Sequence, residues 1–306
     1  MIWIHRNFPR GFDDISKAEM LASGLTQVSE RLFTGDHFDL SNSAYAGFTV
    51  EEISRGKSAE EAIKNICIDI PSPYRVEKLQ GSKRMGSLTY AFLAEDHVGG
   101  DIRAADPAAI ILVFTPDGTC WVTGFLREKE DSVVEKLGEI TERTCVSLAA
   151  QAALALVNLA PDEPIVDPCC GTGLIPLAAL LRGKETYTAD NNYKMLRMAR
   201  LNRDLLDLDI EMPHKEAMEP WIENCCLVTD FPAERSWMSN TKDVSLELFK
   251  AWIPYIKSFC VILPNRLMEN LPENIQINKR INFTADRVII IGTPHKLLTK
   301  QLFPVN

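Results

Sequence analysis

The chain has 306 residues, of which 46% are hydrophobic and 25% are charged, and its formal net charge is −9. These values indicate a globular protein of two or three domains and exclude a disordered or fibrous chain. No apolar run approaches the roughly 18 residues of a membrane span, so no membrane partner is expected. The amino-terminal sequence lacks the apolar core of a cleavable signal, which favours a cytoplasmic location.

The charge distribution and the cysteines further limit which ligands the protein is expected to bind. Residues 1–150 carry 16 basic and 23 acidic side chains, which disfavours non-specific nucleic-acid binding but allows a local basic stripe. The best candidate stripe, which a solvated strand and turn would explain equally well, consists of Arg75, Lys78, Lys83 and Arg84. None of the eight cysteines lies in a Cys-x-x-Cys pair and no histidine is spaced to complete a zinc site, so we expect reduced thiols and no metal.

The first 127 residues predict two small α+β units, because strands and helices are grouped rather than strictly alternating. For residues 1–70, the pattern predicts strands over 1–5, 31–40 and 44–53 and helices over 14–25 and 58–67. For residues 71–127, it predicts strands over 74–79, 108–114 and 120–126 and a helix over 87–100. The sequence TPDG predicts a hairpin between the last two strands.

A charged connection over 128–145 leads to a different pattern, in which helices alternate with short apolar strands. The predicted helices cover 147–160, 174–183, 192–206 and 244–256. The predicted strands cover 164–168, 185–190, 225–230, 258–265, 281–286 and 287–294. Such alternation is typical of a mostly parallel sheet covered on both faces.

The densest chemistry lies in the sequence IVDPCCGTGL, where an apolar strand ends at Asp167 and the chain turns through Gly171 and Gly173 into a helix. Glycines allow a tight turn and the close approach of a ligand to the backbone. Pro176 stands where a dinucleotide fold would need a third glycine, and no Gly-Lys-Ser/Thr triphosphate motif follows. The loop therefore suits an adenosyl ligand without phosphates.

Two further strand ends supply candidate cofactor contacts. The next strand ends at Asp190, followed by Asn191, and a carboxylate at that position can accept both ribose hydroxyls. Glu216 and Ala217 stand where a third strand is expected to end and could meet the adenine edge. The alternative interpretation is that the glycines serve only as tight turns.

The sequence DPCCGTG resembles the DPxCGxG loop of class I S-adenosylmethionine-dependent RNA methyltransferases. The chain as a whole is similar to the tRNA guanine-N2 methyltransferases that carry a THUMP domain. The similarity includes the sequence VNLA before the first strand, TADNNYKML after the loop and the tail 293-TPHKLLTKQL-302. More loosely, DIRAADPAAIILVF and CWVTG resemble the last strands of a THUMP domain.

The resemblance implies a Rossmann-like class I methyltransferase domain over 146–306, with a mostly parallel seven-stranded sheet. It implies a ferredoxin-like unit over 1–70 and a THUMP-like RNA-binding unit over 71–127. The cofactor would be S-adenosylmethionine, held by Asp167, Pro168, Cys169, Gly171, Thr172, Gly173, Asp190, Asn191, Glu216 and Ala217. The partners would be tRNA or another structured RNA and, in some lineages, a small activating protein subunit.

The substrate loop departs from that family, whose members have D-P-P-Y-G-R-S where this chain has 230-DFPAERS-236. Asp230 and the carbonyl of Phe231, stiffened by Pro232, can still hold an exocyclic amine toward a methyl group. Arg235 and Ser236 match the family, but Ala233 replaces the aromatic residue that would stack on a flipped base. Phe231 or Trp237 could supply a ring instead, although packing explains both residues better.

The leading hypothesis from the sequence is thus methyl transfer to an exocyclic guanine N2 amine of RNA. A second is a non-catalytic relative that binds S-adenosylmethionine as a structural or sensing module. A third is methylation of a non-RNA acceptor.

Overall fold

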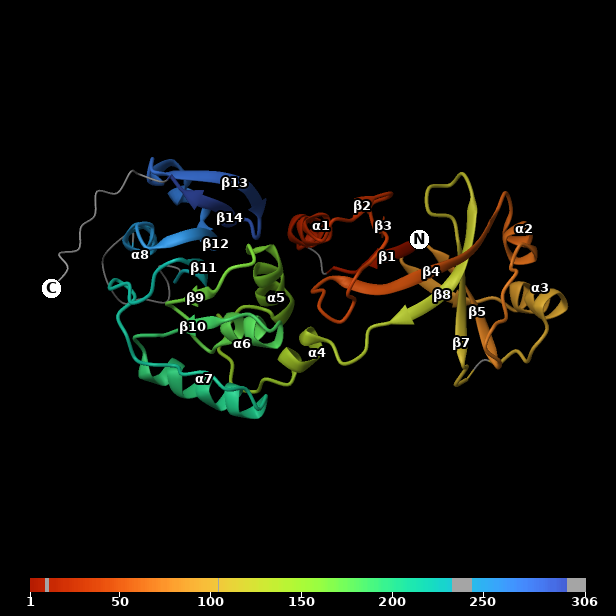
Figure 1. Cartoon of the computed structure of the whole chain (residues 1–306), viewed down its shortest axis with the longest axis horizontal. Coiled ribbons are helices and arrows are strands. Elements are labelled where there is room, and N and C mark those ends of the chain that lie inside the picture. The colour runs from red at the N-terminus through yellow and green to blue at the C-terminus, as the bar shows by residue number, and fades with distance from the viewer. Residues whose placement is uncertain (9–10, 104, 233–243, 296–306) are drawn as a thin grey trace. The chain divides into compact units, whose positions relative to one another are not determined.

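The computed structural model describes residues 1–8, 11–103, 105–232 and 244–295 (Figure 1). The chain divides into two compact units. Unit 1 comprises Met1–Phe8, Met20–Ser41 and Tyr45–Glu130. Unit 2 comprises Pro9–Glu19, Asn42–Ala44 and Asp131–Asn306, so two short amino-terminal segments group with the carboxy-terminal part of the chain.

Unit 1 is built on one eight-stranded sheet with strand order β2-β3-β1-β4-β8-β7-β5-β6. Its strands are β1 (Ile2–Arg6), β2 (Thr26–Gln27), β3 (Leu32–Gly35), β4 (Ala46–Gly56), β5 (Tyr74–Gln80), β6 (Lys83–Gly86), β7 (Ala109–Phe114) and β8 (Trp121–Glu128). Strand β4 pairs with β1 on one side and β8 on the other, so the two predicted amino-terminal units share a single sheet. The TPDG sequence joins β7 to the antiparallel β8, as expected.

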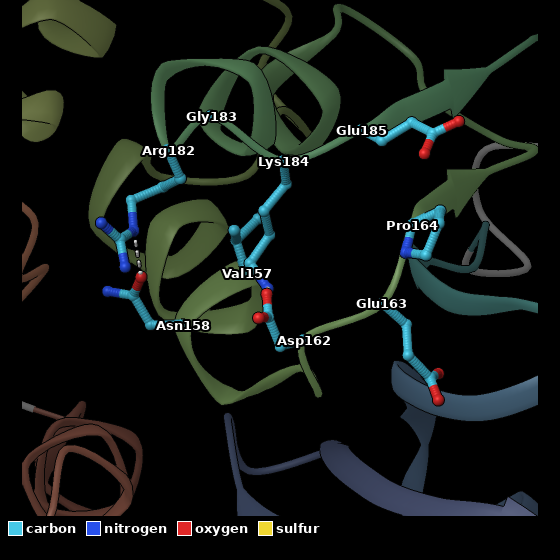
Figure 2. A pocket seen from close by; sticks show the side chains of 9 residues that line it. All are labelled: Val157, Asn158, Asp162, Glu163, Pro164, Arg182, Gly183, Lys184 and Glu185. Carbon is cyan, nitrogen blue, oxygen red and sulfur yellow. Dashed lines mark hydrogen bonds and ion pairs between the residues drawn. The ribbon is translucent and has the colours of Figure 1, made fainter.

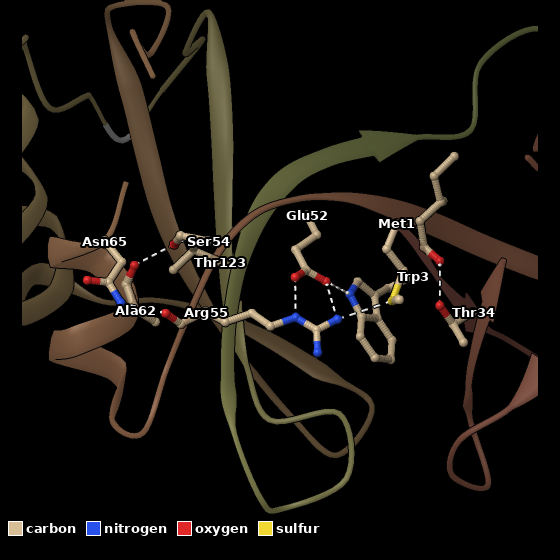
Figure 3. Close-up of polar contacts among 10 residues, drawn as sticks. Met1, Trp3, Thr34, Glu52, Ser54, Arg55, Ala62, Asn65 and Thr123 are labelled. Carbon is tan, nitrogen blue, oxygen red and sulfur yellow. Dashed lines mark hydrogen bonds and ion pairs between the residues drawn. The ribbon is translucent and has the colours of Figure 1, made fainter. Parts of the chain in front are cut away.

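Both faces of this sheet bury apolar side chains, because neighbouring residues on one strand point to opposite sides. Ile111 and Val113 pack with α2 (Ala59–Lys64) and α3 (Leu88–Val98), while Leu112 packs in a separate cluster with Trp3 and Phe48. Polar side-chain contacts also join neighbouring strands of the sheet (Figure 3). Trp3 Nε1 donates to Glu52 on β4 at 2.8 Å, and Ser54 of β4 contacts Thr123 of β8 at 2.5 Å.

Unit 2 is built on a six-stranded sheet with strand order β10-β9-β11-β12-β14-β13. The strands are β9 (Ile165–Asp167), β10 (Thr186–Thr188), β11 (Cys225–Asp230), β12 (Ile256–Pro264), β13 (Ile275–Asn282) and β14 (Arg287–Pro294). The first four strands in the sheet order pair in parallel, and β14 and β13 add antiparallel pairs. Because neighbouring parallel strands end at the same edge, Asp167, Thr188 and Asp230 mark one carboxyl edge of the sheet.

The helices of unit 2 follow the expected alternation. They are α4 (Val133–Gly138), α5 (Ala150–Leu159), α6 (Leu174–Leu181), α7 (Tyr193–Leu205) and α8 (Val244–Trp252), with a 3-10 turn η2 (Asn265–Asn270) after β12. Helix α1 (Asp13–Ala22) begins in unit 2 and ends in unit 1. The central strands are apolar on both faces, with Val166, Leu227, Val261 and Ile290 fully buried. All helices in the described residues are too short or too polar to cross a lipid bilayer.

Three sequence expectations need correction. The expected seventh strand, near 213–217, is reduced among the described residues to one isolated bridge between Asp190 and His214. The edge strand was expected over 281–286 but runs from Ile275 to Asn282, and 283–286 turns the chain into β14. The sequence of β13 is mostly polar, because an edge strand buries few side chains, and it therefore gives a weak strand signal. The expected connection contains α4, whose Ser132 and Glu135 form a capping box.

Candidate functional site at the carboxyl edge of the unit 2 sheet

Both glycines of the loop after β9 have a positive φ, a conformation that glycine adopts readily. Gly171 has φ 55° and Gly173, the residue that caps α6, has φ 91°. A Cβ atom on Gly171 would meet nothing within 4 Å, so the loop borders open space there. A Cβ atom on Gly173 would lie 3.3 Å from the Cβ of Ala199, so this glycine serves packing against α7. The two glycines therefore differ in purpose, and only Gly171 leaves room for a ligand.

Asp167 links this loop to strand β11 through hydrogen bonds. Its side chain is only 1% exposed, and its Oδ1 accepts hydrogen bonds from Thr229 Oγ1 at 2.6 Å and from the backbone N–H of Cys169 at 3.1 Å. Burial raises the pKa of this carboxyl to about 7, and the two hydrogen bonds oppose the shift. Asp167 thus positions the loop between β9 and β11, and its contact with Thr229 was not predicted from the sequence.

Asp190 joins the second strand end to the same loop. Its Oδ2 accepts from the N–H of Gly171 at 2.8 Å, and its Oδ1 accepts from the N–H of Asn192 at 2.8 Å. A carboxylate offers about four lone-pair sites, so Asp190 can still accept a hydrogen bond from a ligand hydroxyl group. Burial raises the pKa of Asp190, and the backbone hydrogen bonds oppose that effect.

The remaining cofactor candidates surround this pair. Thr172 is buried and contacts Ser147 at 3.2 Å, while Asn191 donates to the exposed Glu216 at 3.2 Å. The backbone carbonyl of Ala217 accepts from Trp252 Nε1 at 2.7 Å, so this residue is fixed by the core.

A pair of exposed rings, which no sequence motif indicates, lies beside Asn191. Tyr193 and His214 stack in parallel with their ring centroids 3.9 Å apart, and His214 Nε2 lies 2.9 Å from the carbonyl of Asn191. Tyr193 is 70% exposed, so its second ring face is open to solvent.

Asp230, the last residue of β11, is paired with Arg287, the first residue of β14. The guanidinium binds both carboxylate oxygens, through Nη2 to Oδ1 and through Nη1 to Oδ2 at 3.2 Å. Nη2 also donates to the carbonyl of Phe231 at 3.0 Å. Burial raises the pKa of Asp230, and Arg287 opposes the shift. No sequence signal relates these two residues, because the strand pairing alone brings them together.

The ring of Phe231 belongs to the core. It is fully buried and lies 6.1 Å from the ring of Phe249, so this ring does not supply a surface for base stacking. The carbonyl of Pro232 accepts from Ser245 Oγ of α8 at 2.8 Å. The expected substrate residues Arg235 and Ser236, and the alternative ring Trp237, lie outside the described residues, as does the tail beyond His295.

The predicted basic stripe is largely neutralised within unit 1. Arg75 pairs with Glu77 at 2.8 Å, and Arg84 pairs with Glu128 at 2.5 Å and with Glu77 at 3.6 Å. Lys78 lies over the ring of Trp121, and Lys83 is exposed on the neighbouring strand β6. Of these four residues, only Arg84 also lies over the ring of Phe48.

A cluster of arginines and aromatic rings surrounds His5, and the sequence did not reveal it. Arg31 lies over the ring of Phe8 at 4.6 Å, and Arg84 lies over the ring of Phe48 at 5.2 Å, which in turn stacks on His5. Burial lowers the pKa of His5 to about 4, with Arg31, Arg84 and the buried Arg6 adding to the shift. Within the described part of the chain Arg31 has no acidic partner, and it is partly exposed. We call the three arginines around His5, namely Arg6, Arg31 and Arg84, the cationic cluster.

A surface pocket of about 530 Å³ lies in unit 2, away from this edge (Figure 2). It is lined by residues that precede β9 and β10, including Glu163 and Lys184, and so marks the amino-terminal edge of the sheet. Arg182 donates to Asn158 at 3.0 Å, and Asn158 donates to Glu19 at 2.7 Å. These hydrogen bonds link Glu19 of α1 to Asn158 of α5 and to Arg182 at the end of α6, so we assign the pocket a structural role.

Parallel strands with a glycine loop after the first, an acidic tip after the second and an antiparallel final pair together define the class I methyltransferase fold. No family model matches the sequence, and no curated protein matches it significantly. Solved structures do match in fold. TrmN from Thermus thermophilus is 16% identical, with a TM-score of 0.57 over 96% of this chain and 100% of that chain.

Two further structures support the same fold. A protein described as a possible methylase from Clostridium difficile 630 is 16% identical, with a TM-score of 0.53 over 98% of this chain and 99% of its own. SMU.472, solved in complex with SAH, is 13% identical, with a TM-score of 0.50 over 97% of this chain and 99% of its own. At these identities the likeness shows the fold of the chain.

Proposed function

We propose that unit 2 binds S-adenosylmethionine at the carboxyl edge of β9 and β10. The open space beside Gly171 and the spare lone pairs of Asp190 fit an adenosyl ligand that carries no phosphate. Asp167, Pro168, Cys169, Thr172 and Gly173 would shape the loop, and Asn191, Glu216 and Ala217 would border the base. The similar structure solved with SAH, the demethylated form of this cofactor, supports the same choice.

We further propose that the chain transfers the methyl group to an exocyclic guanine N2 amine of RNA. The carrying observation is the pair of acceptors at the end of β11, the Asp230 carboxylate and the Phe231 carbonyl, on the same sheet edge as Asp190. When bound, S-adenosylmethionine supplies an activated methyl group and a neutral thioether leaving group. Two acceptors aimed at one amine orient its nitrogen lone pair, and the carboxylate can take the proton that the amine loses.

The RNA partner is supported by the cationic cluster of unit 1. Arginines backed by aromatic rings suit phosphate and base contacts, and Arg31 has no acidic partner within the described residues. The choice of tRNA and the small activating subunit rest on the resemblance of the motifs.

A specific observation favours a second candidate, a module that binds S-adenosylmethionine without transferring its methyl group. Arg287 already fills both acceptors at the end of β11. The substrate loop also carries Ala233 where related loops have an aromatic residue. Methylation of a non-RNA acceptor fits the altered loop as well.

Three measurements separate these functions. Calorimetry with S-adenosylmethionine tests the cofactor site, and absence of binding to the wild-type chain would contradict all three. Transfer of labelled methyl to bulk tRNA tests the leading proposal, with Asp230→Ala expected to lose at least about 100-fold in rate at unchanged cofactor affinity. Equal, background-level transfer by both proteins would leave the binding module, and transfer to protein extract but not to RNA would favour the third function.

A further inference from the structure

Arg287 lies at the place in the fold where an acceptor amine is proposed to bind. It begins β14 opposite Pro264 of β12, and Asp230 ends β11 opposite Ile262 of the same strand. One guanidinium therefore occupies the two carboxylate oxygens and the Phe231 carbonyl together. These are the acceptors that the proposed function assigns to the substrate.

The ion pair between Arg287 and Asp230 is accessible to solvent, and one donor of the guanidinium has no hydrogen-bond partner among the described residues. The side chains of Arg287 and Asp230 are 18% and 19% exposed, so solvent and ligands can reach them. Arg287 Nε is buried without a hydrogen-bond partner among the described residues. A buried donor left unpaired weakens the hold of the site on the guanidinium, which makes displacement by a better-matched ligand less costly.

Guanine carries the same arrangement of donors as arginine. Its C2 carbon joins the N2 amine and the N1–H in a guanidine-like fragment, so two N–H donors lie side by side on one edge and can meet a carboxylate in pairs. Adenine offers one donor beside an acceptor nitrogen and leaves a carboxylate oxygen unpaired. Inosine keeps N1–H but lacks the exocyclic amine.

We propose that Arg287 occupies the guanine position at Asp230 and Phe231 and weakens the recognition of guanine there by competing with the base for these acceptors. A base binds there only if it replaces both paired N–H donors of the guanidinium. Guanine can do so with its N2 amine and N1–H, whereas a base edge with a single donor cannot. The inference rests on the proposed function for the choice of a base as the ligand. It adds that Arg287 competes with that base, so removal of Arg287 strengthens guanine binding.

The test compares two single-stranded RNA pentamers that differ only in a central guanosine or inosine. Their dissociation constants are measured by fluorescence anisotropy, without cofactor, for the wild-type chain, Arg287→Ala and Arg287→Lys. Arg280→Ala is the matched control, because Arg280 is exposed on the neighbouring strand β13. We expect Arg287→Ala to raise the preference for guanosine over inosine by about tenfold, since one added charge-assisted hydrogen bond is of that size. Arg280→Ala should behave as wild type.

Arg287→Lys serves as a second variant in case Arg287→Ala fails to fold, because it keeps a cation beside Asp230. Lysine cannot bind both carboxylate oxygens in the planar geometry of a guanidinium. It should also raise the guanosine preference, by a smaller factor. An unchanged preference in a folded Arg287 variant, or an equal rise in Arg280→Ala, would overturn the inference. A raised preference without any methyl transfer would refute the proposed reaction alone. Transfer that depends on Asp230 with an unchanged preference would refute only the role of Arg287.

Discussion

Asp190 accepts a hydrogen bond from the backbone N–H of Gly171 at 2.8 Å and so ties the tip after the second strand to the loop after the first. The contact therefore joins the glycine loop and the acidic residue, two sequence motifs that lie 19 residues apart. It also places the carboxylate within hydrogen-bond distance of Gly171, beside which a Cβ atom would meet open space.

Replacing Asp190 should therefore weaken cofactor binding. We expect Asp190→Ala to raise the dissociation constant for S-adenosylmethionine by about 10- to 100-fold, because hydrogen bonds to a charged group contribute about 1.5–3 kcal/mol. Isothermal titration calorimetry measures the change. Asp204→Ala is the control, since Asp204 pairs with Arg203 on the surface of α7, and a similar loss there would contradict the assignment.

Gly171 should be needed for the ligand more than for the fold. A side chain at φ 55° costs about 1 kcal/mol in strain but meets no neighbouring atom. Gly171→Val should thus fold, with cofactor affinity lowered at least about tenfold. Gly183→Val is a matched control, because Gly183 also has a positive φ of 69° and open space around it. If both variants keep wild-type affinity, the open space is not the cofactor site.

Asp167 should make stability depend on pH in a particular direction. Its folded pKa of about 7 lies above the unfolded value of 3.8, so the folded state holds the proton more tightly. Stability contributed by this group is present below about pH 4 and is lost as pH rises through about 7. Because one pKa unit corresponds to about 1.4 kcal/mol, the loss amounts to roughly 4 kcal/mol.

Asp167→Asn removes this titration and keeps an oxygen to accept from Thr229 and Cys169. Urea unfolding at pH 4.5 and pH 8 should show the variant gaining stability relative to wild type as pH rises. A difference that is constant over this pH range would contradict the raised pKa.

The cationic cluster predicts a specific loss of RNA affinity. Arg31→Ala should weaken tRNA binding by about tenfold and reduce the slope of log K against log salt by about 1, as expected for one lost phosphate contact. Filter binding at several salt concentrations measures both. Arg127→Ala is the control, because Arg127 is exposed on β8 and pairs loosely with Glu51 at 3.9 Å. Equal effects of the two variants would show non-specific attraction instead.

The sequence alone predicted the class of fold and the positions of most helices and strands. Strong local signals account for this success, since an apolar strand followed by Gly171 and Gly173 and then a helix has few other structures open to it. It failed where local signals are weak. The short bridge at His214 and the edge strand Ile275–Asn282 depend on pairing with distant segments, which composition does not reveal.

The candidate site divides in the same way. The sequence alone predicted Asp167, Asp190 and Asp230 at strand ends, because strand ends follow from local periodicity; Asp167 and Asp230 end β9 and β11, and Asp190 lies two residues beyond β10. Only the tertiary structure decided what each carboxylate contacts. Thr229 binds Asp167, the Gly171 amide binds Asp190 and Arg287 binds Asp230. Long-range strand pairing sets those contacts, and the contact between Arg287 and Asp230 bears most directly on whether an acceptor amine can be methylated.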